Sequence, residues 1–201
     1  MTLKLNGSSS GSTSIDAPAS GSDRTITCPD ATGTMALTTD FNNSVTEGSW
    51  TSVGTSTHID VSTTSTDVIK YDILFSGVST DGSNDWQFQL GDAGGLETSG
   101  YNVIAGYDGS NEGTDERDAG WRWKATGTAS FIMDGKFTLT RMNGNKWWGE
   151  GVLIRTEGGT TLYYMYGSKE LSAALTTIRI MASSNLSTDF DGGHFKLITY
   201  K

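Results

Sequence analysis

The residues of this chain that could support nucleophilic catalysis are few and scattered. His58 and His194 are the two histidines, and Cys28 is the single cysteine. A charge relay needs a histidine beside both a nucleophile and an acid, and the two histidines are isolated in the sequence. Cys28 lies in a short apolar–polar run before Pro29, where a small buried apolar group is expected rather than a reactive thiol. We therefore predict packing or surface roles for these residues and no catalytic residue.

Acidic residues are plentiful, but their spacing does not mark a catalytic pair. The run from Tyr107 to Asp118 holds five carboxylates among glycines and polar residues, which is typical of a solvated loop. A glycosidase needs two carboxyl groups about 5–9.5 Å apart across a cleft. The acidic turns Asp81–Asp85 and Asp189–Asp191 resemble the start of a calcium loop but lack its later bidentate acid. We assign no metal site and no cofactor, and a calcium ion in one acidic loop stays open.

Tryptophans are the residues best suited to binding. Trp121 and Trp123, in the run GWRW, share one strand face, whereas Trp147 and Trp148 must point to opposite faces. We predict that Trp147 packs inward and that Trp148 lies at the surface or at a subunit contact. Trp121, Trp123 and Trp148 are the candidate surface or ligand aromatics, able to stack on sugar rings. The alternative for each is packing in the core or between subunits.

Short alternating runs are the elements that must position these side chains. The chain has 26 glycines, only 2 prolines and 18% charged residues, a composition typical of short strands and many turns. The dipeptide Asn143-Gly144 between two alternating runs predicts a hairpin. About eight to ten strands, separated by turn signals, are expected after Trp50, with Lys169–Leu175 as the one helix candidate. This pattern predicts an all-β fold, an antiparallel β-sandwich that is jelly-roll-like.

The net charge restricts the partners. It is -9 at pH 7, and an acidic surface repels the phosphates of nucleic acids and of anionic bilayers. No apolar run approaches the roughly 20 residues of a membrane span, and the first residues lack the apolar core of a secretory signal. We therefore expect no nucleic acid or membrane partner.

An N-terminal β-ribbon of short strands precedes this sandwich. Three short runs between residues 10 and 37 follow a first run at Met1–Asn6. They carry few apolar anchors, too few to offset an ordering cost of roughly 1–2 kcal/mol per residue, so the ribbon should order only against another surface. We predict a ribbon at 1–37 for attachment and oligomerisation, a linker at 38–49 and a body at 50–201. The residues predicted to make attachment or trimer contacts are Ile15, Ile26, Met35 and Leu37.

The same ribbon resembles a segment that recurs in structural proteins of tailed bacteriophages. Over Gly11–Leu37 the chain reads A-P-A-x-G-S, then R-T-I-T-x-P-D, then A-T-G-T-M-A-L. The family usually has leucine where this chain has Cys28, so the position stays apolar. The segment occurs in tail fibres and in virion surface proteins, and it brings no catalytic residues with it.

The resemblance implies a non-enzymatic component of the virion surface, assembled in the host cytoplasm. The function we expect first is that of a homotrimeric capsid cement or decoration protein that binds the major capsid protein or another virion protein. A tail-fibre or receptor-binding module that recognises a host surface glycan is the alternative, and a polysaccharide-degrading enzyme is the third possibility. Position on the virion, head or tail, stays open.

Overall fold

The chain divides into two units, Met1–Asp40 and Phe41–Lys201. In the first unit, β1 (Leu3–Asn6) and β2 (Ser12–Ile15) pair as an antiparallel hairpin with Leu3 opposite Ile15. Ile26, Met35, Leu37 and Cys28 lie outside the described residues, together with the other predicted strands of the ribbon. The computed structural model describes residues 3–6, 11–15, 45–63, 67–82, 85–108, 115–123, 129, 131–157, 159–183 and 186–201.

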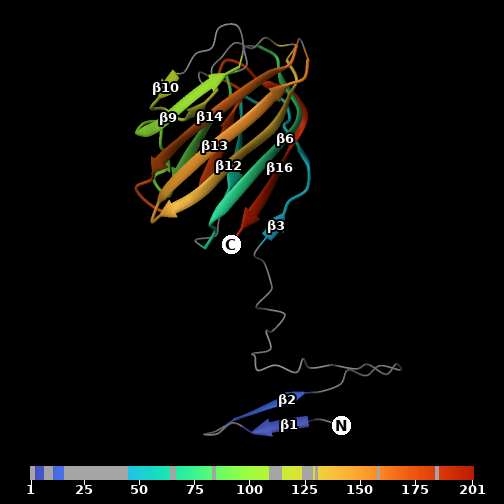
Figure 1. Ribbon diagram of the computed structural model, residues 1–201, viewed down its shortest axis with the longest axis vertical. Coiled ribbons are helices and arrows are strands. Elements are labelled where there is room, and N and C mark those ends of the chain that lie inside the picture. The colour runs from blue at the N-terminus through green and yellow to red at the C-terminus, as the bar shows by residue number, and fades with distance from the viewer. Residues whose placement is uncertain are drawn as a thin grey trace, which may run out of the picture. The chain divides into compact units, whose positions relative to one another are not determined.

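The second unit contains a large antiparallel sheet of nine strands (Figure 1). Eight of them run in the order β10-β9-β14-β13-β12-β6-β16-β3, and β4 also pairs with β16. In chain order the strands are β3 (Val45–Glu47), β4 (Thr51–Ser52), β6 (Lys70–Thr80), β9 (Tyr101–Tyr107), β10 (Asp115–Arg117), β12 (Met133–Asn143), β13 (Lys146–Arg155), β14 (Thr161–Glu170) and β16 (Phe190–Tyr200).

A smaller antiparallel sheet of five strands packs against the large one and completes the sandwich. Its strands are β5 (His58–Ser62), β7 (Gln87–Asp92), β8 (Gly95–Leu96), β11 (Trp121–Arg122) and β15 (Thr177–Met181). From β5 to β12 the chain passes repeatedly from one sheet to the other, as in a jelly roll. The described residues contain no helix, so the predicted all-β sandwich is confirmed.

The hairpin signal at Asn143-Gly144 is also confirmed. β12 and β13 pair directly, and Gly144 occupies the turn with φ 55°, a left-handed conformation that glycine adopts without steric cost. A second hairpin joins β13 to β14 in continuous register from Lys146 to Arg155. These three long strands form the middle of the large sheet.

The core between the sheets is aromatic. Phe88 of β7 stacks on Phe137 of β12 with ring centroids 4.1 Å apart, and Trp121 of β11 lies 5.7 Å from the same Phe137 ring. Gly149 of β13 makes room for Trp121, because a Cβ atom at position 149 would lie 2.3 Å from the indole. A glycine on the inward face of a central strand is therefore what lets the large indole reach the core.

Two sequence expectations differ from the structure. Residues 45–49 were expected in the linker, but Val45–Glu47 forms β3 and pairs with Ile198–Tyr200, so this segment belongs to the sandwich. The helix predicted at Lys169–Leu175 is wrong. Lys169 and Glu170 end β14 instead, and the Lys169 ammonium binds the carboxylate of Glu97 and, at 2.9 Å, the carbonyl of Ser99. These contacts with a distant loop override the local helical preference.

Candidate functional site

The side chains of β13 alternate strictly between the core and the solvent. Trp147 is 4% exposed and Trp148 is 37% exposed, which confirms the predicted orientation of the pair. No bulge interrupts the strand, so Val152 and Ile154 continue on the outer side with Trp148. Val152 and Ile154 are exposed because alternation along the strand places Gly149, Gly151 and Leu153 on the inner side instead. The result is a largely apolar stripe facing solvent on the large sheet, with Glu150 between Trp148 and Val152.

Trp121 and Trp123 are not surface residues, so that part of the aromatic prediction is wrong. They are 0% and 3% exposed. Both indoles fit against glycines of the opposite sheet: Trp121 lies over Gly149, and a Cβ atom on Gly151 would lie 3.0 Å from Trp123. Local sequence placed the two tryptophans on one face, but only the packing of the sheets shows that this face is the inner one.

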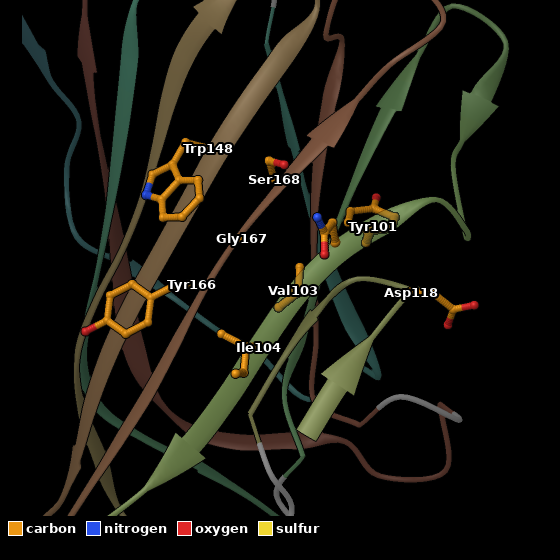
Figure 2. Close-up of a pocket in the computed structure, with 9 residues that line it drawn as sticks. Tyr101, Val103, Ile104, Asp118, Trp148, Tyr166, Gly167 and Ser168 are labelled. Carbon is orange, nitrogen blue, oxygen red and sulfur yellow. The ribbon is translucent and has the colours of Figure 1, made fainter. Parts of the chain in front are cut away.

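Trp148 lines a groove on the outward side of strands β13, β14 and β9, which we call the outer face. Figure 2 shows Trp148 and Tyr166 on one side of the groove, Asp118 on the other, and Gly167 and Ser168 between them. Tyr166 is 39% exposed, so both aromatic rings are available to a ligand. The groove is lined by Tyr101, Asn102, Val103, Ile104, Asp118, Trp148, Tyr166, Gly167 and Ser168.

A second depression adjoins the groove across Tyr166. It is lined by Lys136, Thr138, Glu150, Gly151, Val152 and Tyr166. The strand register places four residues in one row across the sheet: Thr138, Glu150, Tyr166 and Ile104. Trp148 lies two residues before Glu150 on the same side of β13. The two depressions therefore form one continuous surface on the outer face.

A buried carboxylate bounds this surface on the β12 side. Asp72 of β6 accepts hydrogen bonds from the hydroxyls of Thr138, at 2.8 Å, and Tyr200, at 3.0 Å, and its carboxylate lies 3.2 Å from the Lys70 ammonium. Burial alone would raise the pKa of Asp72, but the bonds from Thr138, Lys70 and Tyr200 outweigh it and hold the pKa below its usual range. This cluster is internally satisfied and fixes the neighbouring strands rather than offering a free charge.

Two polar side chains of the groove and one of the second depression are free. Within the described part of the chain, the side chains of Asn102, Ser168 and Glu150 make no hydrogen bond or ion pair. Tyr101 differs, because its hydroxyl donates to the carbonyl of Glu97 and accepts from the amide of Leu90. Burial raises the pKa of Tyr101, so the hydroxyl stays neutral, and its ring packs against Trp121 in the core.

The two histidines lie on strands of different sheets. His58 Nδ1 lies 3.1 Å from the hydroxyl of Thr57, and its Nε2 lies 3.9 Å from Asp60, beyond hydrogen-bond distance. Both carboxylate oxygens of Asp60 bind Arg179. The hydrogen bond from Arg179 lowers the pKa of Asp60. His194 lies on β16 of the other sheet and is exposed. The carboxylate nearest to His58 is therefore engaged by Arg179 rather than by the imidazole.

The structure separates some acidic residues and brings others together, in ways that the sequence did not show. Asp108 accepts a hydrogen bond from the Leu162 amide, and Asp118 lines the groove. The two acidic turns meet, since Asp81 accepts from the amide of Asp189 at 2.9 Å. Within the described residues, no group of three or more histidines, cysteines or carboxylates is placed to hold a metal ion. Among these same residues no helix is long and apolar enough to span a bilayer.

The residues that the sequence missed are Tyr166, Ile104, Asn102 and Ser168. Alternation along 160–166 places Tyr164 and Tyr166 on one face, which was the available signal, but it does not say which face is outward. Ile15 lies in β2, opposite Leu3. The chain matches no protein-family model, no curated protein and no solved structure.

Proposed function

We propose that the protein is a non-enzymatic surface component of a tailed-phage particle, in which the body binds a target through its outer face. The ribbon's resemblance to virion proteins supports the location. The observation that carries the binding role is the groove, where two exposed aromatic rings stand beside unengaged polar side chains. Solvent-exposed apolar and aromatic patches of this kind are typical of interaction sites.

The groove favours receptor recognition, as in a tail-fibre or receptor-binding module, over the capsid decoration first expected from the sequence. A host surface glycan fits a shallow surface with aromatic platforms and free hydrogen-bonding groups. The ribbon then attaches the body to the particle, and homotrimerisation orders a segment too poor in apolar residues to order alone.

Trimeric capsid decoration is the second candidate, supported by Val152 and Ile154. These two side chains extend the exposed apolar stripe beyond the groove, and a stripe of this type also suits contact with a capsid protein or with a second subunit. Burial of that stripe in the assembled shell would stabilise the shell by mass action.

Competition with phage adsorption tests the proposal. Free full-length protein should block adsorption of the phage to host cells, and the Trp148→Ala variant should block it less at equal concentration. The Trp50→Ala variant, which loses an exposed tryptophan between β3 and β4, serves as the control. Full binding to particles that lack the protein, without any effect on adsorption, would favour decoration. Reducing-sugar release abolished by Asp or Glu substitution would refute the non-enzymatic role.

A further inference from the structure

We infer that the groove and its adjoining depression form a single site for an uncharged oligosaccharide, which lies across β9, β14, β13 and β12 and stacks on Trp148 and Tyr166. The inference rests on the proposed function and specifies the ligand class. It concerns the residues defined above as lining the two depressions on the outer face.

The spacing of the two aromatic rings suits one chain of sugars. Ser168 lies opposite Trp148, and Tyr166 lies opposite Glu150, so Trp148 and Tyr166 are diagonal neighbours on adjacent strands. Diagonal neighbours on a sheet are about 7–8 Å apart, within reach of one ligand for two large side chains. Figure 2 shows the two rings along the same side of the groove. A ligand that stacks on one ring therefore extends naturally over the other.

The polar groups around the rings match hydroxyls. A pyranose has an apolar C–H face and a rim of hydroxyls that both donate and accept hydrogen bonds. Asn102 and Ser168 also donate and accept, and both stay free within the described residues. Aromatic faces carry partial negative charge that suits C–H groups. A protein partner with a purely apolar surface would leave these polar groups unsatisfied, at a cost to binding.

The charges select against acidic glycans. Among the nine described residues that line the groove, the single carboxylate or ammonium side chain is that of Asp118. In the second depression, Lys136 and Glu150 carry opposite charges. The whole chain carries a net charge of -9, which repels anions at a distance. Uronic or sialic acid polymers are therefore poor ligands, and neutral hexose chains are favoured.

Calorimetric titration of the full-length protein tests the inference, with neutral hexose oligosaccharides and uronic acid oligosaccharides of matched length as probes. Neutral chains should bind and acidic chains should bind more weakly. Trp148→Ala and Tyr166→Ala should each weaken binding by about tenfold or more, the usual scale for an aromatic anchor. Trp148→Phe should retain much of the affinity because it keeps a stacking face, and Trp50→Ala should bind as the parent does.

Two results would overturn the inference. One is the absence of binding to every neutral chain in the panel. The other is binding that Trp148→Ala leaves unchanged. Sedimentation and phage adsorption measured on the same variants separate this outcome from failure of the proposed function. If Trp148→Ala dissociates an oligomer or abolishes competition for host cells while no neutral glycan binds, the outer face contacts protein, and only the glycan assignment fails.

Discussion

Truncation of the two adjacent tryptophans of β13 should destabilise the protein to very different degrees. Trp147 is buried, and its ring lies 5.8 Å from that of Tyr71. A buried aromatic side chain removes about 150–250 Å² from water, which at about 25 cal/mol per Å² corresponds to about 4–6 kcal/mol. Measured losses for such truncations in cores are about 3–5 kcal/mol, because the cavity partly relaxes. We expect Trp147→Ala to lose about that much.

Trp148→Ala should lose about 1 kcal/mol or less, since more than a third of the side chain already faces water and surface changes are usually small. Urea unfolding followed by far-UV circular dichroism measures both variants, with equal slopes required for the midpoints to be compared. If Trp147→Ala does not fold, Trp147→Phe gives a milder version of the same comparison. A larger loss for Trp148→Ala than for Trp147→Ala would show that the register of β13 is reversed.

Three further predictions concern the core, the buried carboxylate and the ribbon. Gly149→Ala should destabilise the protein by about 1–3 kcal/mol in urea unfolding, because its Cβ atom meets the Trp121 indole. The control Gly144→Ala has open space around its Cβ but a positive φ, so it should act only through backbone strain. Equal losses of stability in the two variants, with no change in the environment of Trp121, would contradict the steric explanation. Because the pKa of Asp72 is lowered in the folded state, its ionised form stabilises the fold at pH values above the unfolded-state pKa near 4, and this contribution is lost as pH falls through the folded-state pKa. The difference in unfolding free energy between the parent and Asp72→Asn should therefore be largest near neutral pH and shrink in acid. A difference that does not depend on pH would argue against this role of Asp72. Deletion of residues 1–37 should leave the thermal transition of the body in place and abolish attachment to particles, and full occupancy of particles by the truncated protein would rule out the ribbon as the attachment element.

The strands and the large hairpins were predictable because their signals are local. Alternating runs and the Asn143-Gly144 turn each act over a few residues, and tertiary packing agrees with them. That Trp147 and Trp148 point to opposite faces was predictable for the same reason. Local alternation assigns the side chains of a strand to two faces. Which of the two faces points inward depends on the rest of the fold.

The parts that sequence did not predict all depend on contacts between distant segments. Trp121 and Trp123 are buried because glycines of β13 receive them, a contact between segments about 28 residues apart along the chain. The segment after Lys169 is not helical because Glu97 binds both the ammonium of Lys169 and, at 2.8 Å, the amide of Ser172. The groove also requires β9 to pair with β14, and no local pattern in the sequence encodes that pairing.

The fit of Trp121 over Gly149 constrains how the sequence can evolve. A larger residue at position 149 is excluded while an indole occupies position 121, and a smaller residue at position 121 leaves a cavity that a side chain at position 149 could fill. The two positions should therefore change together in descendants of this sequence, with glycine retained wherever tryptophan is. The outer side of the same strand carries no such coupling across the core, so Trp148 and Val152 can diversify one at a time. One strand thus combines a face that must be inherited as a matched set with a face on which new binding specificities can arise by single substitutions.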